Sequence, residues 1–394
     1  PQDYDNLADE LRANNGSVRV EFSAKRMAAA FARSSAYDRN IANYFAAQLD
    51  QDTSVVTPES TPDNNSTASV SPRLMISADI KQELRYGENP HQQAALYTSS
   101  ANHGNDKGIA GAKLLNGKAL SYNNLVDANA AWRLACELPD ACCVIVKHAQ
   151  PCGVAVASTQ PLAYQHALMA DKESSFGGIV AVNSILEAET ATLLKEMFLE
   201  VIIAPQFSEE SLAILRAKKN LRLLQCASSH EKESPMTPPK MIKTISGGFL
   251  MQAEDKYIPT AESLEWVTKR KLSDTQEITD LLFAWQVAKV CHSNAIVIAK
   301  DGTTCGIGAG QTSRVFSVRL ALLRAADNDL DVSGSAVASD AFFPFADSVG
   351  LLAEKGIKSI IQPGGSKRDA EVIALADEHN IAMAFTGYRC FYHG

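Results

Sequence analysis

The sequence predicts an α/β fold made of two successive units of alternating strands and helices. Short apolar runs typical of buried strands alternate with helical patterns from about residue 80 to 205, and the alternation starts again near residue 294. Alternating strands and helices imply a sheet covered by helices. With 394 residues, 46% of them hydrophobic and 21% charged, the chain is long enough for two or three domains with their own cores.

The N-terminal part follows a different pattern. Residues 1–50 place apolar side chains three and four positions apart, which predicts helices. Residues 51–73 are rich in Ser, Thr, Pro, Asp and Asn, so we expect a flexible linker there. The domains that we predict are a helical segment at 1–50, a linker at 51–79, a first α/β subdomain at 80–255, and a helical connector with a second α/β subdomain at 256–394.

The first unit is organised around four apolar residues at 143–146, which predict a strand buried on both faces. We expect Pro151 and Gly153 to prevent any continuation in strand or helix. Lys147 and His148 then lie at the rim of the sheet, where open α/β sheets bind ligands. Because histidine titrates near neutrality, this pair could move a proton and hold a developing negative charge. The alternative is a strand that simply ends in two solvated polar residues.

The other elements follow in order along both units. In the first unit we expect a helix from Asn123 with an Asn/Asp-rich first turn, a helix near 160–170, and apolar strand-like runs at 179–182, 200–205 and 221–224. In the second we expect a charged helical connector at about 260–291 with Asp274 as N-cap, a strand at 294–299, a tight turn at Asp301–Gly302, a return strand at 304–308, a helix from Ser313, a strand at 357–361, a helix at 369–378 and a strand at 381–385. The similar order of strands and helices in the two units predicts an internal duplication, although no repeat of individual residues is evident.

Three further segments are candidates for ligand binding. The glycine-rich run at 306–314 is close to a dinucleotide-binding loop, but Gln311 stands at the third glycine position, which disfavours nicotinamide and flavin cofactors. The aromatic run at 342–345 is either core or a flat wall for a planar heterocycle. Arg85 and Arg389 are either separate surface residues or, brought together by the fold, a phosphate clamp.

Composition excludes several classes of protein. The formal net charge of −8 argues against a surface built for nucleic acid. The eight cysteines include no C-x-x-C pair, and no run of 18 apolar residues occurs, so we expect free thiols in a cytoplasmic protein. His148 with Pro151–Cys152 matches half of a zinc deaminase signature, but Gln150 and Ala155 replace the glutamate and the second cysteine. We therefore expect no catalytic metal.

A set of motifs resembles one enzyme family over about residues 80–394. These motifs are Leu84-Arg85-Tyr86-Gly87-Glu88-Asn89-Pro90-His91-Gln92, Tyr122-Asn123-Asn124, Val146-Lys147-His148, Ser175-Phe176-Gly177-Gly178, Ser293-Asn294-Ala295, Gly308-Ala309-Gly310-Gln311 and Ser339-Asp340-Ala341-Phe342-Phe343-Pro344-Phe345. In the same order they resemble the aminoimidazole carboxamide ribotide (AICAR) formyltransferase part of the bifunctional purine biosynthesis family, which joins it to IMP cyclohydrolase. Residues 1–50 resemble the end of the cyclohydrolase half. Because the chain begins without methionine, we expect a fragment of a longer polypeptide. The glycine-rich N-terminal body and the basic residues of the cyclohydrolase site are absent, so we expect that active site to be missing from this chain.

The resemblance implies a fold, a reaction and an assembly. It implies two tandem cytidine deaminase-like α/β/α units, preceded by a helical remnant of the cyclohydrolase domain. The implied reaction transfers the formyl group of 10-formyltetrahydrofolate to the 5-amino group of AICAR in IMP biosynthesis. The resemblance also implies a homodimer with sites at the interface and leaves room for a structural potassium ion.

The resemblance further assigns roles to individual residues. His148 would act as general base on the substrate amine, Lys147 would stabilise the tetrahedral oxyanion or protonate the departing nitrogen, and Asn294 would orient His148 or the formyl group. The implied substrate-binding residues are Arg85, Tyr86, Asn124, Phe176, Glu200, Phe342 and Arg389. The implied folate-binding residues are Ser313, Arg314, Pro344, Phe345 and Asp347.

The chain departs from the family pattern at three positions, where Gln150 replaces an asparagine, His292 a lysine and Ala346 an arginine. Gln150 and Ala346 are close to the expected site, so they put local contacts in doubt but not the class of reaction. Two other classes remain open: a nucleotide-binding module without catalysis, and a zinc-type deaminase.

Overall fold

The computed structural model describes residues 3–52, 76, 78–99, 108–139, 141–227 and 240–394. Contacts within the chain divide it into two compact units, 1–76 and 77–394. The predicted linker falls mostly on residues 53–75, which lie outside the described residues. In the part of the chain that is described, no helix has both the length and the apolar character needed to cross a membrane.

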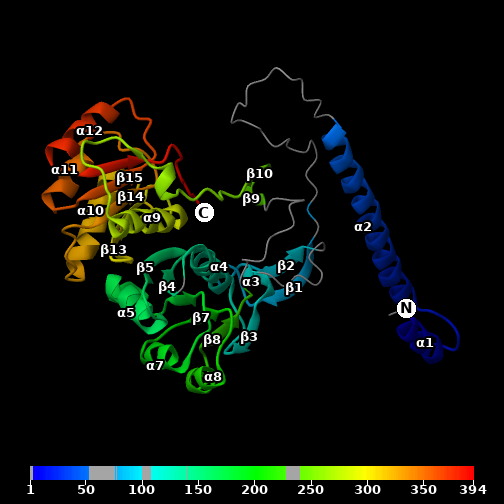
Figure 1. Ribbon diagram of the computed structural model, residues 1–394. Helices are drawn as coiled ribbons and strands as arrows, with labels where there is room; N and C mark the ends of the chain where they lie inside the picture. Colours follow the sequence, from blue (N-terminus) through cyan, green and yellow to red (C-terminus); the bar gives the residue numbers. More distant parts are fainter. Residues whose placement is uncertain (1–2, 53–75, 77, 100–107, 140, 228–239) are drawn as a thin grey trace. The chain divides into compact units, whose positions relative to one another are not determined.

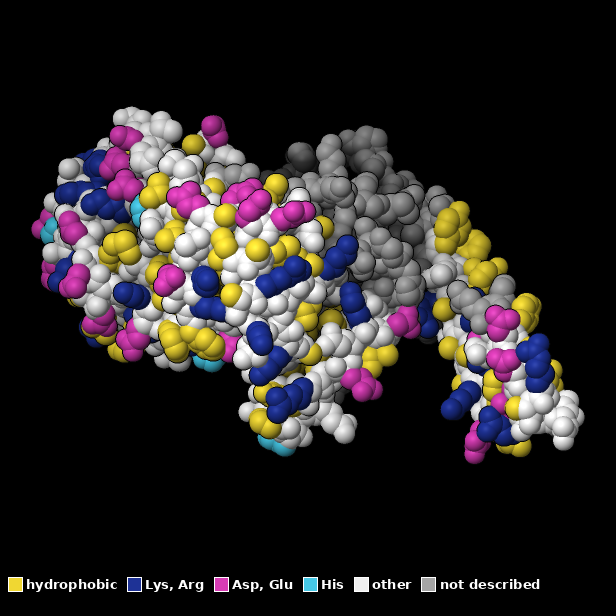
Figure 2. Space-filling model, turned by 90° about the horizontal axis from the view of Figure 1, so that it is seen from below, with side chains coloured by type: hydrophobic (Ala, Val, Ile, Leu, Met, Phe, Trp, Pro, Cys, Tyr) yellow, Lys and Arg dark blue, Asp and Glu magenta, His cyan; other side chains and the backbone are white. Residues whose placement is uncertain are grey.

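The N-terminal unit is helical, as the sequence predicts. It contains α1 (Tyr4–Ala13) and α2 (Val20–Asp52). The guanidinium of Arg19 binds both carboxylate oxygens of the buried Glu10 at 2.7 Å and ties the two helices together. Large apolar side chains remain exposed along α2, among them Met27 and Phe31. Figure 2 shows hydrophobic side chains on the surface of this helix.

The larger unit, 77–394, is a mixed α/β structure (Figure 1). Its first part contains β1 (Ala78–Leu84), β2 (Ala94–Ser99), α3 (Gly108–Gly111), β3 (Lys113–Asn116), α4 (Tyr122–Glu137), β4 (Cys142–Lys147), β5 (Gln150–Val156), α5 (Gln160–Ala170), α6 (Lys172–Ser175), β6 (Ile179–Val182), α7 (Ala188–Glu196), β7 (Val201–Ala204), α8 (Glu209–Leu215) and β8 (Arg222–Gln225). Its second part contains β9 (Lys240–Ile245), β10 (Gly248–Ala253), a 3₁₀ turn (Ala261–Ser263), β11 (Glu265–Trp266), α9 (Thr275–Val290), β12 (Ile296–Lys300), β13 (Thr303–Gly308), α10 (Arg314–Asp327), β14 (Ala336–Ser339), α11 (Asp347–Glu354), β15 (Ser359–Gln362), α12 (Asp369–Glu378) and β16 (Ala382–Phe385).

A 12-stranded sheet runs through the larger unit in the order β11-β16-β15-β14-β12-β13-β5-β4-β6-β7-β8-β3. From its middle outward, each half has the same topology. An antiparallel hairpin (β4–β5 or β12–β13) is followed by one antiparallel neighbour, two parallel strands and an antiparallel edge strand. The α/β class that the sequence predicts is confirmed. Whether the two halves are of the cytidine deaminase type stays a prediction, as do the subdomain boundaries.

Helices cover both faces of this sheet and create three hydrophobic cores. One core lies between the sheet and the pair α4 and α9, and it spans both halves. On the other face, α5, α7 and α8 cover the first half, and α10, α11 and α12 cover the second. Neighbouring residues of β4 show why both faces are buried: Val144 belongs to the first core and Ile145 to the second, because side chains alternate along a strand.

Two expectations from the sequence are wrong, one about β5 and one about residues 260–291. Pro151 and Gly153 do not end regular structure but lie inside β5, which pairs with β4. The proline is tolerated because the pairing shifts between Ile145 and Val146, where β5 carries a bulge. Gly153 is required there, because a Cβ atom would lie 1.9 Å from the carbonyl oxygen of Ala167 in α5.

The expected connector at 260–291 is also different in the structure. Asp274 caps a helix as predicted and accepts a hydrogen bond from the Gln276 N–H at 2.7 Å. The helix begins only at Thr275, and it is a core element rather than a charged connector, since Trp285 is fully buried. Its apolar residues face the sheet and α4. The number of charged residues in the segment did not reveal this buried face.

Candidate active site

Lys147 and His148 stand at the end of β4, as the sequence predicts, but they belong to a tight hairpin. His148 and Ala149 form its two-residue loop and have φ angles of 52° and 58°. Two consecutive positive φ angles are what a type I′ hairpin turn requires. The Ala149 N–H donates a hydrogen bond of 2.7 Å to Oδ1 of Asp127 in α4. The Lys147 ammonium donates to the carbonyl oxygen of Phe176 at 2.8 Å.

A cavity of about 300 Å³, which we call the hairpin cavity, opens beside this turn. Its lining comes from the hairpin, from α5 and α6, and from β13 and α10 of the other half; it consists of Lys147, His148, Gln150, Pro151, Cys152, Ala170, Asp171, Ser174, Ile307, Ala309, Gln311, Leu320 and Arg324. Within it, Arg324 forms an ion pair of 2.8 Å with the buried Asp171. Burial raises the pKa of the Cys152 thiol to about 12, so this cysteine is protonated at neutral pH.

A second cavity of about 500 Å³, the aromatic cavity, lies in the other half of the sheet. It gathers eight residues that the sequence assigned to the site, namely Asn294, Ser313, Arg314, Phe342, Pro344, Phe345, Asp347 and Arg389. Phe342 and Phe345 are 41% and 49% exposed, so their rings are available to a ligand, whereas Phe343 between them is buried in the core. The aromatic run is therefore both core and cavity wall.

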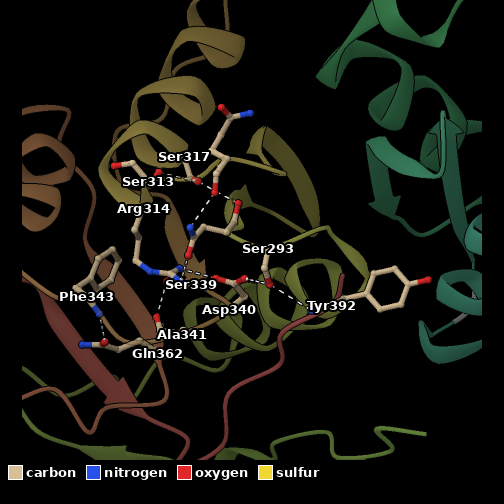
Figure 3. Close-up of polar contacts among 12 residues, drawn as sticks. Ser293, Ser313, Arg314, Ser317, Ser339, Asp340, Ala341, Phe343, Gln362 and Tyr392 are labelled. Atoms are coloured by element: carbon tan, nitrogen blue, oxygen red, sulfur yellow. Dashed lines mark hydrogen bonds and ion pairs between the residues drawn. The ribbon is translucent and has the colours of Figure 1, made fainter. Parts of the chain in front are cut away.

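A buried polar network supports the floor of the aromatic cavity (Figure 3). Arg314 donates to Oδ1 of Asp340 at 2.5 Å and to Oδ1 of Asn294 at 2.6 Å. The Ser293 hydroxyl donates to the other oxygen of Asp340 at 2.6 Å. The Asn294 amide nitrogen donates to the carbonyl oxygen of Gln311 at 2.8 Å. Both ends of the Asn294 amide are thus engaged, and the structure does not place this side chain against His148.

Both cavities lie at one edge of the sheet. Adjacent strands from β4 through β5, β13 and β12 to β14 are antiparallel, so the end of β4, the start of β12 and the end of β14 share that edge. Residues 309–313 run between the cavities, since Gln311 lines the first and Ser313 the second. The hairpin of the first half contacts the segment before β12 there, since the His292 backbone N–H donates to Gln150 Oε1 at 3.0 Å.

A family model for the AICARFT/IMPCHase bienzyme matches residues 1–324 of the chain. The chain belongs to this bienzyme family. The match begins at residue 1 and so includes α1 and α2 of the N-terminal unit. It ends before the aromatic run at 342–345, whose part in the site is inferred from the cavity and from the motif resemblance.

Other residues expected for the bienzyme site lie elsewhere. Phe176 and Glu200 line a third cavity of about 730 Å³ beside Lys147, where Glu200 pairs with Arg222 at 2.6 Å. Arg85 lies over the Tyr86 ring, 5.5 Å from its centroid, outside all three cavities. Asn124 is buried, and its Oδ1 accepts from the Ser121 N–H in the capping box of α4. These assignments stay predictions.

Two positions where this bienzyme chain departs from the family pattern are in contact. Gln150 Oε1 accepts a hydrogen bond of 3.0 Å from the backbone N–H of His292. The third departure, Ala346, precedes α11 and packs against the core of the second half.

Asp127 was not predicted as a site residue, because only the repeated order of strands and helices was recognised and not the repeat of individual residues. The segments Lys147-His148-Ala149-Gln150-Pro151-Cys152-Gly153 and Lys300-Asp301-Gly302-Thr303-Thr304-Cys305-Gly306 share Lys, Cys and Gly at the same spacing. An aspartate precedes each lysine by 20 positions, Asp127 in α4 and Asp280 in α9. This repeat was readable from the sequence, and the structure shows that the two segments are equivalent hairpins.

Proposed function

We propose that this chain catalyses transfer of the formyl group from 10-formyltetrahydrofolate to the 5-amino group of AICAR. The observation that supports this most is the arrangement of the site in a member of the bienzyme family. An exposed Lys–His turn lies at the same sheet edge as a cavity that combines aromatic walls with arginine and carboxylate side chains. The family itself uses AICAR as substrate.

His148 is the general base in this proposal. The AICAR amine is a weak nucleophile, and removal of its proton by a positioned base typically contributes about 10²–10⁴-fold to the rate. His148 is exposed in the turn, and the hydrogen bond from Ala149 to Asp127 fixes the backbone beside it. When the amine attacks the formyl carbon, the C–N bond to AICAR forms and the carbonyl oxygen becomes negatively charged.

Lys147 completes the transfer. Its ammonium, anchored on the carbonyl oxygen of Phe176, would stabilise the oxyanion or give its proton to the departing folate nitrogen. The tetrahedral intermediate then collapses with cleavage of the bond between the formyl carbon and the folate nitrogen. Asn294, held by Arg314 and Gln311, would present its amide to the formyl group or carboxamide rather than to His148.

The aromatic cavity would hold the planar parts of the ligands. Phe342, Phe345 and Pro344 form a rigid wall against which rings can stack. Arg389 and Arg85 would hold the ribotide phosphate with Tyr86, while Asn124, Phe176 and Glu200 would complete the nucleotide site. Ser313 and Asp347 would bind folate. Arg314 is buried and ion-paired, so its contribution would be to shape the wall.

The assembly is part of the same proposal. Arg85, Tyr86 and Asn124 lie outside the cavities of the single chain, which supports a homodimer in which a second copy completes the site. The structural potassium ion stays a prediction. A zinc deaminase reading has less support, because Gln150 and Ala155 stand where its signature has the glutamate and the second cysteine.

The test is absorbance-monitored conversion of 10-formyltetrahydrofolate to tetrahydrofolate, with and without AICAR. We expect conversion only when AICAR is present. Binding of AICAR without any loss of formyl-folate would instead support the non-catalytic module, and release of ammonia from a cytidine or adenosine substrate would support a deaminase.

A further inference from the structure

The two hairpins at the middle of the sheet are held in the same way. In the second half, Asp280 of α9 accepts hydrogen bonds from the Asp301 and Gly302 N–H groups at 2.9 and 2.8 Å. In the first half, Asp127 occupies the equivalent position of α4 and accepts from the Ala149 N–H at 2.7 Å. Each half therefore uses a half-buried or buried carboxylate from the helix before the hairpin to fix its turn.

The turns themselves differ in chemistry. Asp301–Gly302 is a sequence that readily adopts a turn with positive φ, because glycine and aspartate tolerate the left-handed region. His148–Ala149 has no glycine, and the left-handed backbone region is sparsely populated for a residue such as alanine. A strained turn persists only where its surroundings hold it, and in this hairpin the Asp127 carboxylate is the helix group that does so.

Burial acts on both carboxylates in the same direction. It raises the pKa of Asp127 and of Asp280, while the hydrogen bonds from the turns oppose that rise. The positive charge of a protonated His148 also favours the ionised form of Asp127. The carboxylate therefore interacts with the turn through a hydrogen bond and with the imidazole through charge.

We propose that Asp127 is a positioning residue that holds the His148–Ala149 turn in its left-handed conformation and so aims the His148 imidazole at the substrate. This inference rests on the proposed formyl transfer. The other ionisable groups around the imidazole are Lys147 on the same strand, Cys152 on β5, Asp171 beside α6 and Arg324 on α10, all in the hairpin cavity. Asp127, unlike Asp171, accepts a hydrogen bond from the turn backbone.

The chain offers a matched pair of variants for the test. Asp127→Ala and Asp280→Ala each remove a carboxylate that fixes a hairpin, and only the first hairpin carries a histidine. In the full chain, we expect Asp127→Ala to lower kcat by about 10- to 100-fold, the loss typical of a misplaced catalytic group, with KM for both substrates nearly unchanged. Asp280→Ala should leave kcat near that of the wild type.

Asp127→Asn separates the hydrogen bond from the charge. Its amide oxygen can still accept from Ala149, so most of the turnover should return. Recovery of kcat in Asp127→Asn but not in Asp127→Ala would show that the hydrogen bond to the turn, rather than the charge, positions the imidazole.

Hydrogen exchange keeps the inference testable apart from the reaction. The Ala149 amide should exchange slowly in the wild type and in Asp280→Ala, and fast in Asp127→Ala. If the wild type shows no AICAR-dependent turnover, the proposed function fails, while the exchange result still decides whether Asp127 holds the turn. Equal protection of Ala149 in both alanine variants, or equal kcat, would overturn the inference.

Discussion

Gln150 and His292 are joined by a hydrogen bond in which the His292 backbone N–H donates to Gln150 Oε1 at 3.0 Å. The contact ties the hairpin of the first half to the segment that leads into β12 and Asn294. Both positions depart from the pattern of the family, and the structure shows that they are neighbours. The two departures therefore form one local feature between the two cavities.

Removing this contact should weaken the interaction between the two halves of the sheet. Gln150→Ala deletes the acceptor, and we expect a loss of about 0.5–1.5 kcal/mol in the free energy of unfolding, typical of one hydrogen bond. Turnover should fall as well, because the contact no longer fixes the positions of Lys147 and Asn294 relative to each other. Urea titration and the formyl-folate assay measure the two effects; an unchanged midpoint with unchanged turnover would show that the contact carries neither.

Close packing between the hairpin and α5 makes a second prediction. Gly153→Ala would place a methyl group 1.9 Å from the Ala167 carbonyl oxygen, so strand and helix must separate. We expect a loss of about 1–3 kcal/mol or more, the usual range for overpacking. Gly350→Ala in α11 is the control, since its methyl group would meet Leu375 at 3.7 Å, an ordinary contact. Equal thermal stability of the two variants would contradict the packing argument.

The two hairpins show what could be predicted from the sequence. The strand at 143–146 and the turn at Asp301–Gly302 were predicted correctly, because one is a continuous apolar run and the other has standard turn residues. The return strand that follows His148–Ala149 was missed, since the hydrogen bond from Ala149 to Asp127 that fixes the turn is a tertiary contact. Pro151 misled for the same reason, because the bulge that tolerates it exists only in the paired sheet.

The candidate site likewise has features that the sequence predicted and features that it did not. The family resemblance named eight residues of the aromatic cavity, and four of them, Asn294, Phe342, Pro344 and Phe345, stand in the quoted motifs. They did not reveal that Arg314 and Asp340 are buried partners, or that Asn294 is engaged at both ends of its amide. Those facts depend on how β12, β14 and α10 pack, which residue type alone does not determine.

The buried ion pair of Arg314 and Asp340 makes a third prediction. Both side chains are at most 5% exposed, so Asp340→Ala leaves an uncompensated buried charge. We expect a loss of about 3–5 kcal/mol in the free energy of unfolding. Glu371→Ala removes an exposed partner of Arg368 and should change stability by less than about 1 kcal/mol. Denaturant unfolding of both variants decides this, and a small effect for Asp340→Ala would contradict it.

His292 should make stability depend on pH. Burial, followed by the nearby His393 and Lys243, lowers the pKa of His292 below its ordinary value of 6.5. The folded protein then binds fewer protons than the unfolded chain below that pH, so this contribution to stability is present above pH 6.5 and is lost as the pH falls through the lowered pKa. The urea midpoint should therefore decline from pH 7.5 to about 5.5, and His292→Gln should flatten that decline. A wild-type slope that survives the substitution would assign it to other groups.

The most direct test compares the two equivalent hairpins in the formyl-folate assay with AICAR. His148→Ala and Lys147→Ala should each lower turnover by at least about 100-fold while the protein remains folded, because they remove the base and the cation of the transfer. Lys300→Ala, which changes the equivalent lysine of the second hairpin, should retain turnover close to that of the wild type. Near-normal turnover in both first-hairpin variants, or an equal loss in Lys300→Ala, would contradict the assignment of the reaction to the Lys147–His148 turn.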